Sequence, residues 1–225
     1  MEAELGFWAF SKVVVIPRLF EGMLITLKLT IITGTLGFIL GMLIALLRIS
    51  RVKFLNYFAI VYITLFRGTP LLLQILFVYF ALPTLFDITL DSMPAGILAL
   101  SLNAAAYLAE IFRAGILSIP KGQMEAGRAL GLSHNQVMFK IIIPQTYRRI
   151  IPPVVNEFSA LTKETSLVSV ISLSELLYVT QRIGAKYLRP WEVYFWAALG
   201  YLLVVLVLSF TASYLERKLE SKGGV

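Results

Sequence analysis

Apolar residues along this chain fall into blocks of about 20, separated by shorter stretches rich in charged residues, glycine and proline. At about 1.5 Å per residue, a helix of that length crosses the roughly 30 Å hydrocarbon core of a bilayer. The pattern therefore predicts an all-α membrane protein in which residues 1–225 form one transmembrane domain. Five spans are expected, at about 22–47, 54–82, 94–117, 150–172 and 192–215.

The fourth block is the most polar of the five. It contains Asn156, Glu157, Lys163 and Glu164. Polar side chains are costly against lipid, so this span is predicted to be shielded inside the helix bundle. An odd number of spans also places the two ends of the chain on opposite sides of the membrane.

Composition agrees with this picture. Hydrophobic residues make up 58% of the chain and charged residues 15%, and the mean hydropathy is +0.82. A soluble domain contains about 45–50% apolar and about 25% charged residues. The chain has no cysteine, which excludes disulfides, thiolate metal sites and cysteine nucleophiles, and the lone His134 cannot form a histidine-rich metal site.

The distribution of basic residues predicts the orientation, because lysine and arginine are retained on the cytoplasmic side. With the N-terminus outside and the C-terminus inside, the inner segments hold twelve of the 20 basic residues. These are Arg48, Arg51, Lys53, Arg113, Lys121, Arg128, Lys140, Arg148, Arg149, Arg217, Lys218 and Lys222. The connection at 82–94 has no basic residue and lies outside. The loop at 118–149 is then cytoplasmic.

The formal net charge of +7 follows from this topology and needs no nucleic acid to explain it. The basic residues are not interleaved with the aromatic stripe that binds single strands. Trp191, Tyr194, Trp196 and Tyr214 flank the fifth block and suit the two interfacial belts of a membrane protein.

The loop at 118–149 is predicted to contain a short helix. Pro120 can open a helix, and Gly131 can end one by adopting a left-handed conformation. A helix of about 10 residues is only marginally stable alone, so it needs a surface to pack against. Ser133 and Gln136 fit a capping box that begins a second helix, which runs to Pro144.

The spacing within this loop resembles the EAA loop, by which permease subunits of ABC importers dock on their ATPase. Glu125, Ala126, Gly131, Ile141 and Pro144 match that motif. Two positions differ from it, since Gly127 stands in place of alanine and Ile143 in place of leucine. Gly127 costs about 1 kcal/mol of helix propensity relative to alanine.

The resemblance to permeases of polar amino acid ABC importers extends from about Gly22 to the C-terminus. It rests on FRGTPLLLQ at 66–74, AYLAEIFRAGI at 106–116, GQMEAG at 122–127, IIIPQTYRRIIPP at 141–153 and LTKETSL at 161–167. It implies five spans per subunit, a homo- or heterodimeric permease unit, two ATP-binding cassette subunits and an extracytoplasmic solute-binding protein. It also implies location in the inner or plasma membrane of a prokaryote, as a multi-pass protein in contact with lipid.

In this family the short helix inserts into the ATPase as a coupling helix, here about Gly122 to Leu130. The contact candidates are Glu125, Ala126, Arg128 and Gly131. The chain contains no G-x-x-x-x-G-K-[ST] phosphate loop. We therefore expect that it is not an enzyme and binds no cofactor, and that ATP is bound by a partner subunit.

Polar residues inside the predicted spans are the candidates for contact with the solute, because such residues face a cavity or another helix. They lie on stripes of the second, third and fourth spans. The candidate residues are Arg67, Gln74, Asn103, Tyr107, Asn156, Lys163 and Glu164. An amino acid carries an ammonium and a carboxylate, for which Glu164 and Arg67 supply opposite charges. An unpaired acid in the bundle favours basic amino acids as the solute.

Structural roles compete with these assignments. Glu110 lies three residues before Arg113 and can pair with it. Arg67 can pair with an acid or cap a broken helix. Gly34, Gly37 and Gly41 have the spacing of close helix packing.

Two other functional classes share some of these features with an importer permease. An ion-coupled secondary carrier or a channel subunit would share the apolar composition, but such folds commonly show internal repeats, and none is evident. An intramembrane enzyme would need a motif such as H-E-x-x-H or a serine–histidine arrangement, and the sequence offers only the adjacent Ser133 and His134.

Overall fold

The computed structural model describes residues 5–221, and these residues are helical with short connections. Lys222, one of the twelve basic residues expected on the cytoplasmic side, lies outside the described part of the chain. The helices are α1 (Phe7–Phe10), α2 (Ile16–Arg48), α3 (Lys53–Gly68), α4 (Leu71–Leu76), α5 (Leu82–Phe86), α6 (Ser92–Leu117), α7 (Lys121–Ala129), α8 (His134–Val137), α9 (Ile143–Glu164), α10 (Leu176–Tyr187) and α11 (Pro190–Ser221). Wider π-helical turns cover Ser11–Val15, Phe77–Ala81 and Met138–Ile142, and a 3₁₀ helix covers Thr165–Ile171.

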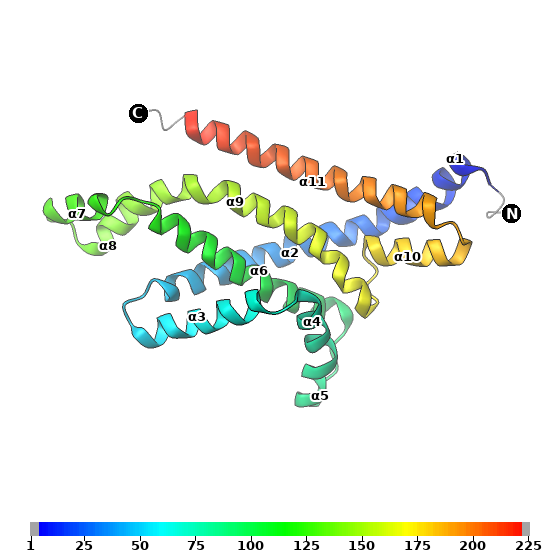
Figure 1. The fold of residues 1–225 in the computed structure, drawn as a ribbon, viewed down its shortest axis with the longest axis horizontal. Coiled ribbons are helices and arrows are strands. Elements are labelled where there is room, and N and C mark those ends of the chain that lie inside the picture. Colours follow the sequence, from blue (N-terminus) through cyan, green and yellow to red (C-terminus); the bar gives the residue numbers. More distant parts are fainter. Residues whose placement is uncertain (1–4, 222–225) are drawn as a thin grey trace.

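The long helices α2, α6, α9 and α11 run side by side along the long axis of the molecule (Figure 1). Helices α7 and α8 lie at one end of this bundle, and α1 and α10 lie at the other. Helices α4 and α5 leave the bundle sideways. The first helix of the chain begins earlier than the expected boundary near residue 22, because α1, the π-helical turn and α2 are continuous from Phe7 to Arg48.

Each π-helical turn ends two residues before a proline: Pro17, Pro83 and Pro144. A proline lacks the N–H that the carbonyl four residues earlier would accept, and its ring collides with that carbonyl. In all three cases the carbonyl in question, that of Val13, Tyr79 or Lys140, lies within the wider turn. The wider turn thus lets the helix continue through the proline.

Small residues bring α2 and α6 into close contact. A Cβ atom on Gly37 would lie 2.9 Å from the Ala104 Cβ, and one on Gly41 would lie 2.9 Å from the Ala105 carbonyl oxygen. Gly34 lies against the Phe158 ring of α9 in the same way. The prediction that these three glycines serve helix packing is confirmed, as is usual where small residues let membrane helices approach each other.

Three helices of the described residues are long and apolar enough to span a membrane: Phe7–Arg48, Ser92–Leu117 and Pro190–Lys218. The second expected span, 54–82, is broken, because Lys53–Gly68 and Leu71–Phe86 meet at 104°. If this bent pair forms one span, the described residues contain four candidate spans. Helix α9 has 22 residues, which gives it a length of about 33 Å, but its polar side chains set it apart from these apolar helices.

Candidate functional site: an exposed docking helix and a polar cluster

Helix α7 has the predicted start and end. It follows Pro120, its last residue is Ala129, and Gly131, whose φ is +82°, forms the turn that closes it. The Leu132 N–H donates to the Gly127 carbonyl at 3.2 Å, and the Gly131 N–H donates to the Arg128 carbonyl at 3.0 Å. This pair of bonds is a Schellman motif, in which a left-handed glycine satisfies the last carbonyls of the helix.

Gly127 is the one buried residue of α7, and it holds the helix against the next segment. A Cβ atom at this position would lie 2.7 Å from the Val137 Cγ2 atom. A larger side chain at this position would collide with Val137, so the glycine that departs from the family motif is needed for close packing. This need outweighs the low helix propensity of glycine. A small apolar core of Ile119, Val137 and Ile142 lies beneath α7.

The coupling candidates Glu125, Ala126, Arg128 and Gly131 are all exposed, and Leu130 beside them is 82% exposed. The Arg128 Nη1 atom donates to the Leu132 carbonyl at 2.9 Å, which fixes the turn after the helix. The capping box is also confirmed, since the Gln136 N–H donates to the Ser133 hydroxyl and the Ser133 N–H donates to the Gln136 side chain. Helix α7 thus presents a firmly held, exposed surface at one end of the bundle (Figure 1).

The second helix of this loop does not end at Pro144. Helix α8, the π-helical turn and α9 follow one another without a break from His134 to Glu164. Pro144 is accommodated by the π-helical turn Met138–Ile142 directly before it, which lets the helix continue through the proline. The surface against which α7 packs is therefore the beginning of a helix that runs the length of the bundle.

Gln74 and Asn103 meet at the break between α3 and α4. The Gln74 side-chain amide donates to the Phe66 carbonyl at 2.9 Å and to the Thr69 carbonyl at 3.1 Å. The Asn103 amide of α6 donates to the Phe66 carbonyl at 3.2 Å and to the Gln74 side-chain oxygen at 3.0 Å. These two side chains donate to backbone carbonyls that lose their helical partners at the break. This is the capping role that the sequence also allowed for Arg67.

Arg67 and Tyr107 form a separate pair close to this break. The Arg67 guanidinium carbon lies 5.0 Å from the centre of the Tyr107 ring, within the range of a cation–π contact. Both side chains are exposed. The Arg67 guanidinium also interacts electrostatically with Glu157 of α9.

The last turns of α9 bring the remaining candidates together. Glu157 lies within electrostatic range of Glu164 and Arg67, and Glu164 lies within electrostatic range of Lys163. Glu157 and Glu164 are half-buried, whereas Asn156 and Lys163 are exposed on the neighbouring face. Among the described residues the ion pairs are Glu110–Arg113 and Arg189–Glu192, so neither Glu157 nor Glu164 has a salt-bridge partner there. Arg67 and Glu164 thus both lie within electrostatic range of Glu157, and we refer to these three residues as the polar cluster.

Glu110 has the structural role that its spacing allowed. Its carboxylate binds the Arg113 guanidinium through two nitrogens, with a shortest distance of 2.8 Å. Both groups lie near the end of α6 that leads into α7. The prediction that this acid pairs within its own helix is confirmed.

Sequence reasoning missed a buried carboxylate at Glu175. This side chain is fully buried at the start of α10 and accepts hydrogen bonds from the Tyr178 N–H at 2.7 Å and from the Tyr201 hydroxyl at 2.8 Å. The neighbouring Leu176 N–H donates to the Thr26 hydroxyl at 3.2 Å. The group ties α10 to α2 and α11. Its position directly before an apolar run is the one signal that could have identified it as a helix cap.

The sequence matches a family model described as "Binding-protein-dependent transport system inner membrane component" over residues 37–222. The arginine transport system permease protein ArtQ of Bacillus subtilis is 43% identical over 209 residues, covering 92% of this chain and 94% of ArtQ. The glutamine transport system permease protein GlnP of Escherichia coli K12 is 39% identical over 206 residues, covering 91% of this chain and 94% of GlnP.

Solved structures show the same fold. A crystal structure of an amino acid ABC transporter with histidines matches with a TM-score of 0.89 and 37% identity, covering 95% of this chain and 99% of that chain. An inward-facing structure of the MetNI methionine ABC transporter matches with a TM-score of 0.78 at 19% identity, a likeness of fold alone. The chain therefore belongs to the family of binding-protein-dependent transport system inner membrane components.

Proposed function

We propose that this chain is the permease subunit of an ATP-driven amino acid importer. Two such subunits, of the same or different sequence, form the transmembrane unit. Two ATP-binding cassette subunits bind and hydrolyse ATP, and an extracytoplasmic solute-binding protein delivers the amino acid. The observation that carries this proposal is the exposed helix α7, which has the EAA-like residues on its surface and a closed Schellman turn at its end.

The packing of α7 offers a route by which the ATPase acts on the solute path. Gly127 seats α7 on Val137, at the start of the continuous helix that leads to Glu164. That helix covers 31 positions from His134 to Glu164, or about 45 Å. A displacement of α7 through Glu125, Ala126, Arg128 and Gly131 is therefore transmitted along this helix to Glu157 and Glu164, which shifts them relative to Arg67 of α3, as alternating access requires.

The polar cluster is the proposed contact for the solute. It offers the Arg67 guanidinium to an amino acid carboxylate and the carboxylates of Glu157 and Glu164 to an ammonium group. Lys163, Asn156 and Tyr107 border it, while Gln74 and Asn103 hold the broken helix beside it. Neither acid has a salt-bridge partner among the described residues, which favours a solute with an additional positive charge, and we propose basic amino acids. This chain needs no cofactor for that role.

Two experiments test this function: purification of the complex from the membrane, and transport assays in vesicles. We expect an ATPase of separate sequence to co-purify with the chain, and vesicles containing the complex to take up a labelled amino acid only with ATP and the solute-binding protein. A panel of amino acids then identifies the solute. Uptake that persists without any ATPase subunit and follows an ion gradient would instead identify a secondary carrier.

Five spans with the N-terminus outside and the C-terminus inside complete the proposal. The apolar helices supply three spans, the bent pair α3 to α5 a fourth, and α9 a fifth whose polar side chains face the solute path. Charge supports the direction, because most basic residues then lie on the cytoplasmic side.

Two single cysteines in this cysteine-free chain test the orientation. A cysteine at Ser92 should react with an impermeant thiol reagent added outside intact cells, whereas one at exposed Ser133 should react only after the cytoplasmic face is opened. Both residues begin or cap a helix, so the substitutions leave the bundle core unchanged. The opposite labelling pattern would reverse the topology and remove α7 from the cytoplasm.

A further inference from the structure

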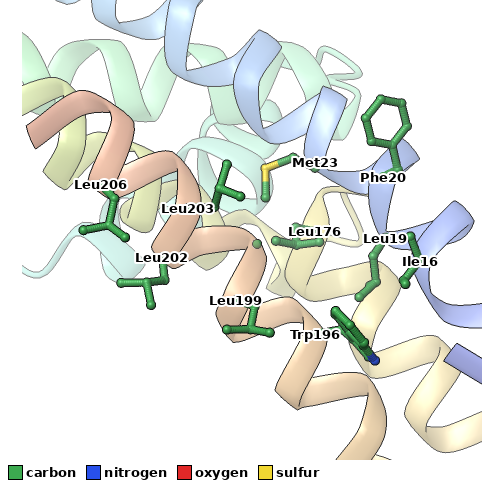
Figure 2. Close-up of a pocket in the computed structure, with 11 residues that line it drawn as sticks. Ile16, Leu19, Phe20, Met23, Leu176, Trp196, Leu199, Leu202, Leu203 and Leu206 are labelled. Atoms are coloured by element: carbon green, nitrogen blue, oxygen red, sulfur yellow. The ribbon is translucent and has the colours of Figure 1, made fainter. Parts of the chain in front are cut away.

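An apolar groove of about 570 Å³ lies between α2 and α11, away from both α7 and the polar cluster. Figure 2 shows Ile16, Leu19, Phe20 and Met23 of α2 along one side and residues of α11 along the other. All of its lining residues are apolar except for the nitrogen of Trp196, which is already bonded to the Ser11 hydroxyl at 2.8 Å.

The charges of α11 locate this groove in the membrane. The stretch from Val193 to Leu215 has no charged residue. As a helix it measures about 33 Å, close to the thickness of the hydrocarbon core. The groove covers the part from Trp196 to Leu206, which is about 15 Å long and so about half of that thickness. It therefore occupies one leaflet, on the side where α11 begins.

This length argues against a helix of a second protein as the occupant. A membrane-spanning partner helix would need a groove along the whole of α11, and the groove ends at Leu206. The exposed residues beyond it, such as Val207 and Phe210, do not line the groove. An extended hydrocarbon chain fits a channel that is one leaflet deep and apolar throughout.

The mouth of the groove has the chemistry of a lipid headgroup site. Lys12 lies one helical turn before Ile16 and is exposed. Trp8 and Trp191 are 75% and 73% exposed, and the Trp8 ring lies 6.5 Å from the ring of Trp196. Tryptophan rings and a lysine with a long stem are the side chains that settle at the level of lipid headgroups.

We propose that this groove binds one phospholipid, with an acyl chain between α2 and α11 and its phosphate at Lys12. Gly200 forms part of the floor, where a Cβ atom would lie 3.1 Å from the end of the Met23 side chain. Leu176 and Gly200 also line the groove and are the chain neighbours of Glu175 and Tyr201, whose hydrogen bond holds α10 against α11 beside it. The inference rests on the chain being a membrane protein and holds whatever solute it carries.

Photo-cross-linking tests the site in the complete transporter. The complex is placed in vesicles of phosphatidylethanolamine and phosphatidylglycerol that contain a trace of phospholipid with a diazirine in one acyl chain. We expect cross-links to concentrate on Ile16–Met23 and Trp196–Leu206 and to be sparse on the exposed residues of α11 beyond Leu206. Leu203→Trp, which fills the groove, should remove this excess, whereas Val207→Trp, on the same helix outside the groove, should leave it intact.

Lys12→Gln tests the headgroup contact independently, because this substitution leaves the apolar groove open. A lysine near the surface of a membrane contributes enough binding energy that its loss should lower the labelling about fivefold. Labelling spread evenly along the exposed face of α11 in the unsubstituted protein would show ordinary lipid contact and overturn the proposal. Cross-links from the groove to another protein chain in place of lipid would overturn it as well.

Discussion

Gly131→Val is expected to abolish solute-stimulated ATP hydrolysis by the assembled transporter while the chain still enters the membrane. The φ of Gly131 is +82°, a conformation that valine adopts only with strain. A Cβ atom built at this position meets no atom within 4 Å, so the effect is one of backbone conformation alone. The left-handed conformation costs valine about 1–2 kcal/mol, and this strain destabilises the turn that closes α7.

Relaxing that strain means breaking the Schellman bonds of Leu132 and Gly131. The end of α7, with exposed Leu130 and Arg128, then loses its fixed position against the ATPase. Membrane insertion is governed by the apolar helices, which are remote from this turn. ATP hydrolysis with and without the loaded solute-binding protein measures the effect.

Gly122→Val is the matched control. It adds the same side chain to the same helix, also with no atom within 4 Å of the new Cβ, but its backbone is not left-handed. Coupled ATP hydrolysis should therefore survive in this variant. If Gly131→Val hydrolyses ATP as the control does, α7 is not the docking helix.

Helix α7 could be predicted from the sequence because its start and end depend on residues within a few positions of each other. Pro120, Gly131, Ser133 and Gln136 act through local backbone geometry, and the structure has each in its expected role. The close packing of Gly37 and Gly41 was also predictable, since small residues at helical spacing have few other uses in an apolar helix.

The break between α3 and α4 depended on a contact that local patterns do not contain. Gly68 and Pro70 can loosen the backbone locally, but they do not determine the direction of the bend. At the bend of 104° the Phe66 carbonyl accepts from Gln74 and also from the Asn103 amide of α6, which is distant in sequence. The same holds for Glu175, whose hydrogen-bond partner Tyr201 lies on another helix.

The polar residues of the spans were predicted as solute contacts from their side-chain type and spacing, and that role stays a prediction. Arg67 and Glu164 do come into one cluster through Glu157, as opposite charges in a bundle are expected to do. Gln74 and Asn103 share a stripe with polar neighbours in the sequence, but in the structure their side-chain amides bind the backbone. Periodicity gives the face of a helix and does not tell whether that face meets a solute or another helix.

Glu164→Gln is expected to reduce uptake of arginine or lysine about tenfold or more while assembly and basal ATP hydrolysis persist. The substitution keeps the shape of the side chain and removes its charge. A hydrogen bond between a carboxylate and a cationic solute is worth about 1–3 kcal/mol, and about 1.4 kcal/mol corresponds to a tenfold change. Glu164 is half-buried and has no salt-bridge partner among the described residues, so its carboxylate is available to a solute.

Initial uptake rates in vesicles, together with thermal unfolding of the purified complex, separate this role from a structural one. Glu21→Gln is the matched control, since Glu21 is an exposed acid on α2 and no part of the polar cluster. A solute contact lowers uptake and leaves the unfolding temperature unchanged, because no protein group loses an ion pair. If Glu164 instead supports the fold through Lys163, the unfolding temperature falls and uptake per folded complex stays near that of the Glu21 variant. Wild-type uptake of basic amino acids at normal stability would remove Glu164 from the solute path.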